Sequence, residues 1–253
     1  MKLFSRVSGS GEPLIILHGL FGMSDNWQTL AKQFADFFEV HLLDHRNHGR
    51  SFHDEHFSYK HLSDDLYNYI QYNKLSNVSL IGHSLGGKTV MYFSTEYPQI
   101  VRKLVVVDIS PKFYPIHHQT IIDGLFAVDN TDLKSRSEAD KILSQYINET
   151  DVRQFLLKSL YWNEKKKLKF RFNLNAISKN IANVGQQLNQ YNRFTKPTLF
   201  LKGEKSDYIK DEDEEKIFFH FPDTYIQTIS EAGHWLHAEK PNQFYEIVTR
   251  FLL

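Results

Sequence analysis

A serine within a glycine-rich pentapeptide is the strongest candidate for covalent chemistry in this chain. Ser84 is the central residue of the segment 82–86, GHSLG, which matches the G-x-S-x-G pattern of nucleophilic serines. A short apolar run, residues 78–81, precedes the motif, and a helical pattern follows it. In that strand–turn–helix context the serine hydroxyl projects from a sharp, strained turn. The segment therefore predicts that Ser84 attacks an ester or thioester carbonyl.

The segment 18–21, HGLF, supplies candidate donors for an oxyanion hole. It follows an apolar run at 14–17. Hydrolases with a nucleophilic serine take one backbone N–H from such a loop and a second from the residue after the serine. Leu20 and Leu85 are the corresponding residues here, and Phe21 is an alternative to Leu20. Each such donor stabilises a transition state by about 3 kcal/mol.

His234 is the candidate general base. The chain contains 13 histidines, so placement rather than residue type must decide among them. The segment 233–237, GHWLH, follows the last strand-like run, and Gly233 gives the loop freedom to bring His234 over Ser84. His237 is the rival. It lies three residues later, just before a helix, and is expected to make a structural hydrogen bond instead.

A His-Asp-Glu-His cluster at residues 53–56 has the residue types of a metal site. It lacks the spacing of H-E-x-x-H, which places two histidines on one face of a helix. His45 and His48 are expected to lie in a tight loop after a strand. We therefore expect neither a metal nor a cofactor in the chemistry.

Alternating strands and helices must position these residues. Short apolar runs that are typical of strands buried on both faces occur at 14–17, 40–43, 78–81, 104–107 and 198–201, with a less clear one at 225–229. Helical patterns lie between them at 27–37, 59–72, 87–97, 212–219 and 242–252. The alternation predicts an α/β fold with a mostly parallel sheet.

The stretch between the fourth and fifth of these runs breaks the alternation. Residues 110–195 are polar and helix-like, with no run typical of a buried strand. A helical insertion there would lie above the strand ends, where open α/β sheets bind ligands. We therefore expect a core formed by residues 1–109 and 196–253, and a helical cap, or lid, formed by residues 110–195.

Composition narrows the class of protein. Of 253 residues, 41% are hydrophobic and 24% are charged, and the formal net charge is zero, which predicts no nucleic-acid partner. The absence of cysteine excludes disulfides and a thiol nucleophile. The sequence shows no signal-peptide core and no run near the ~20 apolar residues of a membrane helix. We expect a cytoplasmic protein without membrane insertion, and both a monomer and a homodimer are compatible with the sequence.

Five segments together resemble the α/β-hydrolase superfamily. They are 18–22 (HGLFG), 44–51 (DHRNHGRS), 82–88 (GHSLGGK), 107–111 (VDISP) and 233–241 (GHWLHAEKP). The set is most similar to the YbfF-type esterases and spans nearly the whole chain. The resemblance implies a mostly parallel eight-stranded sheet flanked by helices, with a helical cap inserted after the strand that ends at Asp108. It also implies hydrolysis of acyl esters, or of acyl-CoA thioesters, without a cofactor.

The acid that orients His234 has two candidates. Most α/β-hydrolases place it after the strand that follows the cap, where Asp207 stands one residue beyond the expected position, Ser206. The other location is the end of the strand after the nucleophile's helix, which is Asp108. YbfF-type esterases use that earlier aspartate with an assisting serine, so the resemblance implies Asp108 with Ser206, and Asp207 is the alternative. Either acid preserves the chain order Ser, Asp, His.

The segment 164–174 of the expected cap alternates cations with apolar side chains. The cations are Lys167, Lys169 and Arg171, and the apolar residues are Leu168, Phe170 and Phe172. An amphipathic segment with packed apolar side chains and solvated cations is the simpler interpretation. The sharper hypothesis is that the cations bind the phosphates of a CoA ester.

Other functions are compatible with the same residues. A carbon–carbon bond hydrolase and a cofactor-free perhydrolase share the Ser–His–acid set, and a weakly catalytic small-molecule binding protein would keep the pocket. The residues favour hydrolysis of a small-molecule acyl ester or thioester. The acyl group would pass through Ser84 and be released by a water that His234 activates.

Overall fold

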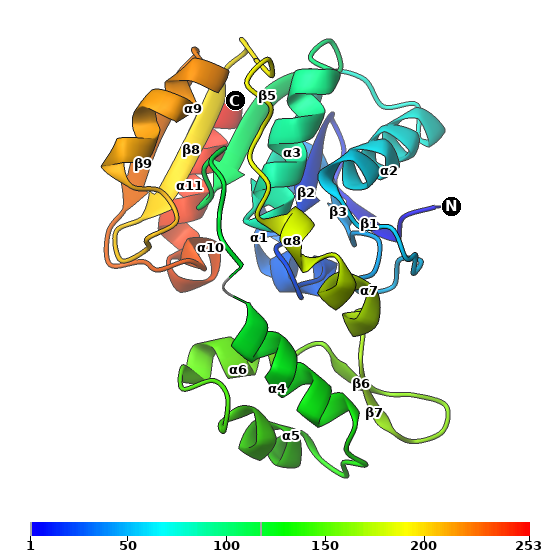
Figure 1. Ribbon diagram of the computed structural model, residues 1–253. Coiled ribbons are helices and arrows are strands. Elements are labelled where there is room, and N and C mark those ends of the chain that lie inside the picture. The colour runs from blue at the N-terminus through cyan, green and yellow to red at the C-terminus, as the bar shows by residue number, and fades with distance from the viewer. Residues whose placement is uncertain (1, 117) are drawn as a thin grey trace.

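Seven strands form the main sheet of the protein. The computed structural model describes residues 2–116 and 118–253, and within them the strand order is β1-β3-β2-β4-β5-β8-β9 (Figure 1). Every neighbouring pair is parallel except β1 with β3. The strands are β1 (Ser5–Ser8), β2 (Glu12–Leu17), β3 (Phe38–Leu43), β4 (Val78–His83), β5 (Val101–Val107), β8 (Thr198–Gly203) and β9 (Thr224–Ile229).

The sheet has one strand fewer than the resemblance implies. The resemblance implies eight strands, and the main sheet formed by the described residues contains seven. β1 itself forms the edge of the sheet, where it pairs antiparallel with β3. The prediction of a mostly parallel α/β sheet is confirmed, and the number eight is wrong.

Helices cover both faces of this sheet. In β2, Ile15 packs on the face covered by α2, α3 and α9, whereas Ile16 packs on the opposite face with α1 and α11. Burial on both faces explains why the central strands are wholly apolar rather than alternating. The helices are α1 (Gln28–Phe34), α2 (Tyr59–Tyr72), α3 (Leu85–Glu96), α9 (Glu214–His220) and α11 (Pro241–Leu252).

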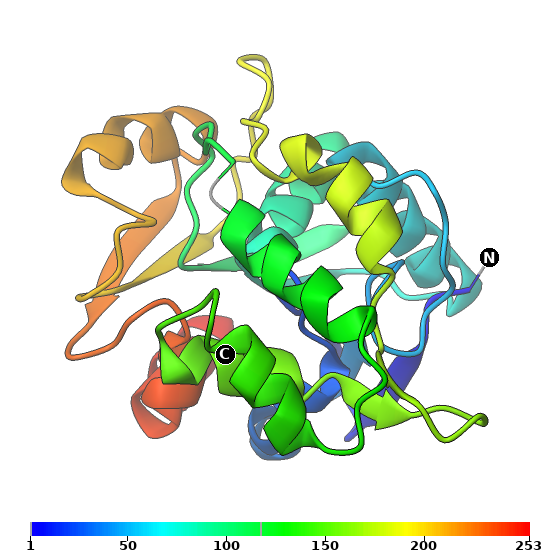
Figure 2. The same ribbon diagram turned by 60° about the horizontal axis from the view of Figure 1, so that its bottom comes forward.

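Residues 110–195, between β5 and β8, form an insertion at the carboxyl ends of the strands. Figure 1 shows α4, α5 and α6 as a separate lobe below the core, and Figure 2 shows the same lobe from beneath. A short antiparallel pair, β6 (Leu160–Trp162) and β7 (Leu168–Phe170), follows them, so the insertion contains a small two-stranded sheet in addition to the expected helices. The helices are α4 (Gln119–Asp129), α5 (Arg136–Leu143), α6 (Thr150–Leu157), α7 (Leu174–Lys179) and α8 (Ile181–Val184).

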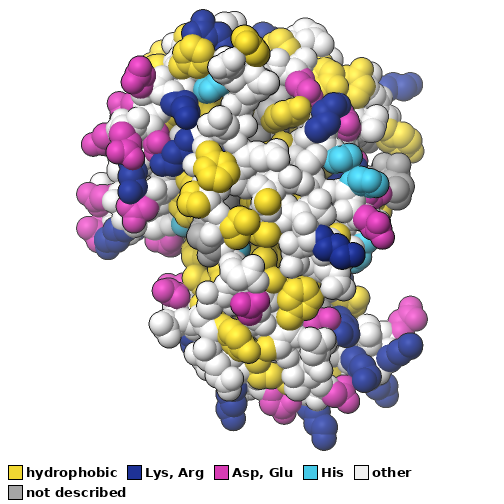
Figure 3. All heavy atoms as spheres, viewed as in Figure 1, with side chains coloured by type: hydrophobic (Ala, Val, Ile, Leu, Met, Phe, Trp, Pro, Cys, Tyr) yellow, Lys and Arg dark blue, Asp and Glu magenta, His cyan; other side chains and the backbone are white. Residues whose placement is uncertain are grey.

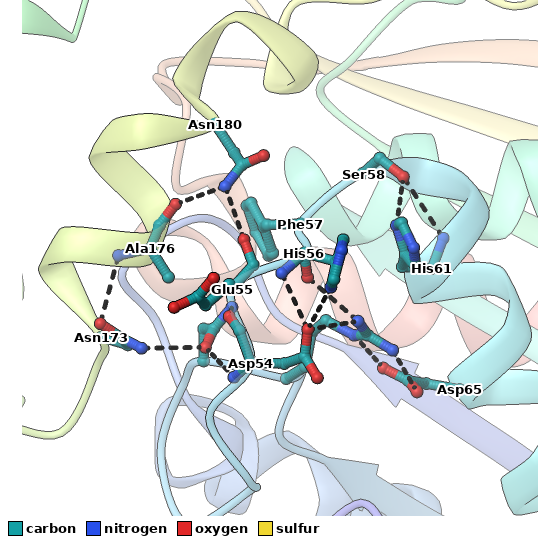
Figure 4. A network of polar contacts seen from close by, with 12 residues as sticks. Asp54, Glu55, His56, Phe57, Ser58, His61, Asp65, Asn173, Ala176 and Asn180 are labelled. Atoms are coloured by element: carbon teal, nitrogen blue, oxygen red, sulfur yellow. Dashed lines mark hydrogen bonds and ion pairs between the residues drawn. The ribbon is translucent and has the colours of Figure 1, made fainter.

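The two halves of the insertion contact the core in different ways. In the second half, Asn180 Nδ2 donates to the carbonyl oxygen of Glu55 at 2.9 Å (Figure 4), and the Asn173 N–H donates to that of Asn47 at 2.8 Å. The described residues 119–171 make no hydrogen bond or ion pair to the core. Their apolar side chains pack on the core instead. The segment 119–171 therefore contacts the core through apolar side chains.

A buried lysine holds the two segments that join the insertion to the core. Lys88 in α3 is 1% exposed, and its Nζ donates to the carbonyl oxygens of Lys112 and Gln186. Burial lowers the pKa of Lys88 to about 7. The two carbonyls lie near the beginning and the end of the insertion, so this side chain fastens both connections to the helix that follows Ser84.

Hydrophobic side chains gather where the core meets the lower lobe on the face shown in Figure 3. Charged side chains lie mainly around the margin of that face. Phe113 and Ile116, in the segment that joins β5 to α4, are more than half exposed. Across residues 2–116 and 118–253, no helix has the length and apolar character needed to cross a bilayer.

Candidate active site

Ser84 occupies the sharp turn that its motif predicts. It follows β4 and precedes α3 with φ 52° and ψ −113°, a backbone conformation that few residues other than glycine adopt. The turn fits because its neighbours lack side chains. A Cβ on Gly82 would lie 2.2 Å from the carbonyl oxygen of Gly86, and one on Gly86 would lie 2.4 Å from that of Leu17. Steric constraint therefore explains both glycines of the motif.

His234 and Asp108 meet beside this turn. His234 lies in the loop after β9, and its Nδ1 donates to Asp108 Oδ2 at 2.8 Å. Asp108 directly follows β5 and is fully buried, with φ 51°. Its Oδ1 accepts the Gly203 N–H at 3.0 Å, and its Oδ2 also accepts the Ser206 hydroxyl. Three donors thus hold one buried carboxylate in a single orientation.

The contact with Asp108 determines which nitrogen of His234 is available. With the Nδ1 hydrogen donated to the carboxylate, Nε2 carries a lone pair that can accept a proton. Ser84 and His234 line the same cavity, although Ser84 Oγ and His234 Nε2 make no hydrogen bond in this structure. Catalytic hydrogen bonds are often open in unliganded enzymes and close when substrate binds, so this arrangement is compatible with a general base.

Asp207, the alternative acid, lies away from the imidazole. Its side chain is 96% exposed, and its Oδ1 is 3.9 Å from Lys210 Nζ. The structure therefore brings Asp108 and Ser206 to His234, and it does not bring Asp207 there.

Two residues that the sequence did not single out fix the loop that carries His234. Tyr208 stacks on the His234 ring, with centroids 3.9 Å apart and planes 18° apart. His83 Nε2 donates to the His234 carbonyl oxygen at 2.9 Å. Burial, with the nearby rings of His237 and His234, lowers the pKa of His83 well below its ordinary value, which keeps the ring neutral. His83 occupies a variable position of the serine motif, and no pattern in the sequence marks Tyr208.

A buried histidine shapes the loop that carries Leu20. His18 Nδ1 donates to the Gly19 carbonyl oxygen at 2.8 Å, and its Nε2 accepts the His45 N–H at 3.1 Å. Burial lowers the pKa of His18 to about 4, so the neutral ring can serve as donor and acceptor at once. The Gly19 carbonyl and the Leu20 N–H belong to one peptide plane and point in opposite directions. The hydrogen bond to Gly19 therefore sets the direction of the Leu20 N–H.

The N–H of Phe21, the alternative oxyanion donor, is already used. It donates to His48 Nε2 at 3.1 Å, and burial lowers the pKa of His48 to about 3, which keeps that nitrogen an acceptor. Within the described part of the chain, the N–H groups of Leu20 and Leu85 donate to no other protein atom. Leu20 and Leu85, rather than Phe21, are therefore available to an oxyanion.

The remaining candidate histidines lie outside the cavity. His237 stacks on Trp27 with ring centroids 4.1 Å apart, and burial lowers its pKa to about 3. Its Nδ1 has no hydrogen-bond partner among the described residues, so the expected structural hydrogen bond is not made there. In the cluster at 53–56, His56 Nδ1 lies 3.0 Å from Asp54 Oδ1 in the loop before α2 (Figure 4).

Two cations of the segment 164–174 pair with carboxylates of the insertion, and the Arg171 guanidinium lies over the Tyr161 ring, 4.3 Å from its centroid. Lys169 Nζ donates to Asp129 Oδ1 at 2.8 Å, and Lys167 Nζ lies 3.4 Å from Asp132 Oδ1. Their apolar neighbours are buried: Leu168, Phe170 and Phe172. These contacts match the simpler interpretation, an amphipathic segment with packed apolar side chains.

The fold is that of an α/β-hydrolase. Residues 12–127 match the family model described as the alpha/beta hydrolase fold. Esterase YbfF of Escherichia coli (strain K12) is 33% identical over 245 residues, which cover 96% of this chain and 94% of the relative. The sn-1-specific diacylglycerol lipase ABHD11 of Mus musculus is 36% identical over 247 residues, which cover 94% of this chain and 80% of the lipase. A solved structure described as a marine microorganism esterase has a TM-score of 0.96 at 43% identity and covers 99% of both chains.

These comparisons place the chain in a family. It belongs to the α/β-hydrolases and is similar to the YbfF esterase over most of its length, as the five segments indicate. The esterases and lipases among its relatives support an ester-hydrolysing member of that family.

Proposed function

We propose that this protein is a serine hydrolase that cleaves carboxylic esters through an acyl-enzyme on Ser84. The observation that carries the proposal is the hydrogen bond from His234 to the buried Asp108, at a cavity that Ser84 also lines. A nucleophile, a base and a group that orients the base are the three parts that acyl transfer by serine needs. The similarity to esterases supports the same chemistry.

The first step forms the acyl-enzyme. Ser84 Oγ attacks the carbonyl carbon while its proton passes to His234 Nε2, and the Asp108 carboxylate stabilises the imidazolium. The oxyanion accepts the N–H groups of Leu20 and Leu85, each of which stabilises it by about 3 kcal/mol. When the tetrahedral centre collapses, the alcohol oxygen leaves with the proton from His234, and the acyl group remains on Ser84 Oγ.

The second step releases the acid. A water gives its proton to His234 Nε2 and attacks the acyl carbon, and the proton then returns to Ser84 Oγ as the carboxylic acid leaves. Ser206 is a positioning residue in this scheme, because its hydroxyl bonds to the same Asp108 oxygen that receives His234.

Residues 110–195 act in this proposal as a cap over Ser84. α4 and α6 contribute Ile121, Val152 and Phe155 to the wall of the larger cavity beside the serine. Carboxylic esters are favoured over acyl-CoA thioesters because Lys167 and Lys169 pair with carboxylates inside the insertion, and neither these lysines nor Arg171 line the cavities at Ser84. The cytoplasmic location stays a prediction from the sequence.

Hydrolysis of p-nitrophenyl acetate by the wild type and by Ser84→Ala tests the proposal. We expect steady turnover by the wild type and only the uncatalysed rate with Ser84→Ala. Ser94→Ala is the matched control, because Ser94 is a buried serine of the same helix whose hydroxyl bonds to the Met91 carbonyl. Equal rates in the wild type and Ser84→Ala would contradict the proposal. Faster hydrolysis of acetyl-CoA than of the ester would contradict the choice of substrate class.

A further inference from the structure

Two cavities of very different size meet at Ser84. The larger has a volume of about 200 Å³, and His234 and Trp235 form part of its wall. The smaller has a volume of about 20 Å³ and is lined by Leu85 and by residues of the segments 109–116 and 181–185. Ser84 and Leu20 line both cavities. An ester carbonyl bound between the serine and the oxyanion donor would therefore direct one substituent into each cavity.

General acid catalysis decides which substituent enters which cavity. The leaving oxygen takes its proton from His234 Nε2, so it must lie about 3 Å from that nitrogen. Of the two cavities at Ser84, the described residues place His234 in the wall of the larger one only. We propose that the larger cavity binds the alcohol of the ester and the smaller one binds the acyl chain. This assignment rests on the proposed function, because it requires Ser84 as nucleophile and His234 as acid.

The volume of the smaller cavity limits the length of the acyl chain. One water-sized group needs about 10–15 Å³ on this measure, so about 20 Å³ accepts a methyl group and little more. Tyr59 lies in the wall, and its hydroxyl already donates to the Val184 carbonyl oxygen at 2.6 Å. Ile109 and Ile181 in the same wall are buried. The small volume of the cavity therefore selects short acyl groups such as acetyl.

Hydrogen bonds hold both segments that form the wall of the smaller cavity. The Tyr114 N–H donates to the Gly185 carbonyl oxygen at 2.8 Å, which joins the two wall segments to each other. A Cβ on Gly185 would lie 2.0 Å from the Tyr114 carbonyl oxygen, so the segments pack without spare room. Lys88 binds carbonyls on the continuation of each segment, at Lys112 and Gln186. A longer acyl chain would have to break these contacts to enter.

The wall of the larger cavity is apolar and less constrained. α6 contributes Val152, Phe155 and Leu156, and the ring of Phe155 contacts that of Trp235 with centroids 5.3 Å apart. These α6 residues belong to the segment 119–171, which contacts the core through apolar side chains and not through hydrogen bonds or ion pairs. The larger cavity, which is proposed to bind the alcohol, can therefore adapt to large apolar groups. The expected substrates are short-chain esters, above all acetates, of bulky apolar alcohols.

Two series of esters test the assignment in the wild-type protein. The acyl series holds p-nitrophenol constant and extends the acid from acetate to butyrate to octanoate. The alcohol series holds acetate constant and extends the alcohol from ethyl to hexyl to 2-naphthylmethyl. We expect kcat/KM to fall by at least about tenfold from acetate to butyrate and to rise along the alcohol series, in line with the effect of methylene groups in fitted pockets. A wild-type preference for octanoate would overturn the assignment.

Variants of the two walls then test each cavity separately. Ile181→Ala enlarges the smaller cavity, and we expect it to raise the butyrate-to-acetate ratio of kcat/KM by about tenfold without changing the alcohol series. Phe155→Ala enlarges the larger cavity and is expected to change the alcohol series only. If Ile181→Ala does not fold, Ile181→Val is the milder replacement, with a smaller shift of the same ratio. An acyl preference that moves with Phe155→Ala, and not with Ile181, would reverse the assignment.

The same measurements separate this inference from the proposed function. Hydrolysis of both series no faster than by Ser84→Ala would overturn the proposed function and the cavity assignment together. Hydrolysis that Ser84→Ala abolishes, but that favours long acyl chains, would overturn the cavity assignment alone.

Discussion

Replacing Asp108 by asparagine changes the charge of the proposed site and little of its shape. Asparagine tolerates the positive φ of 51° found at this position. Its amide nitrogen must replace either Oδ1, which accepts the Gly203 backbone N–H, or Oδ2, which accepts donors from His234 and Ser206. The backbone donor cannot change, whereas the Ser206 hydroxyl can rotate and the imidazole can move its proton. The amide nitrogen will therefore face His234, and the imidazole proton will shift from Nδ1 to Nε2.

That shift removes the base without unfolding the protein. With its proton on Nε2, His234 cannot accept the proton of Ser84, and a triad histidine in the wrong tautomer lowers kcat by about 10⁴, or about 5 kcal/mol in activation free energy. The assay is hydrolysis of p-nitrophenyl acetate by Asp108→Asn, with a urea titration to show that the variant is folded. Asp207→Asn is the matched control, since that side chain is 96% exposed, and it should retain the wild-type rate. A near-wild-type rate in Asp108→Asn together with loss of activity in Asp207→Asn would refute this reasoning.

Three further predictions concern the oxyanion loop, a buried ion pair and acid stability. Gly19→Ala would place a Cβ 2.8 Å from His83 Nδ1, so the loop must shift and the Leu20 N–H must move with it. We expect kcat to fall by about 10², and an unchanged kcat would contradict the role of this loop. Arg46→Ala removes two hydrogen bonds, of 2.6 and 2.8 Å, from the buried Asp65. The free energy of unfolding, measured by urea titration, should fall by about 3–5 kcal/mol because a buried carboxylate loses its partner. An unchanged urea midpoint would contradict the importance of the Arg46–Asp65 ion pair. The pKa of His18 falls from 6.5 to about 4 on folding, so between these values the unfolded chain binds a proton that the folded chain does not. The free energy of unfolding should therefore decrease as the pH falls from 6.5 to 4, by about 3 kcal/mol from His18 alone, and a constant value over that range would contradict the buried neutral ring.

The strands and the residues at their ends were predictable because both depend on local sequence. A strand covered by helices on both faces must be apolar throughout, and the runs at 78–81 and 104–107 lie within β4 and β5. Ser84 and Asp108 directly follow those strands, and parallel pairing brings the two strand ends together. The glycines around Ser84 are required by the close approach of backbone atoms, so the motif carries its own steric explanation.

Contacts between distant segments were not predictable in this way. The choice between Asp108 and Asp207 depends on how the loop after β8 turns, and a shift of one residue along the chain separates a buried contact from an exposed side chain. The stacking of Tyr208 on His234 joins two loops whose sequences do not depend on each other. The hairpin of β6 and β7 was missed although residues 167–172 alternate strictly between cations and apolar side chains, which is the period of a strand.

Mass spectrometry of the protein quenched with acid during turnover of p-nitrophenyl acetate would detect the acyl-enzyme itself. We predict a single acetyl group on the peptide that contains Ser84, formed as quickly as p-nitrophenol is released, with no such adduct in Ser84→Ala. Turnover that continues in Ser84→Ala, or an acetyl group that forms at this rate on another residue, would contradict the assignment of Ser84 as the nucleophile.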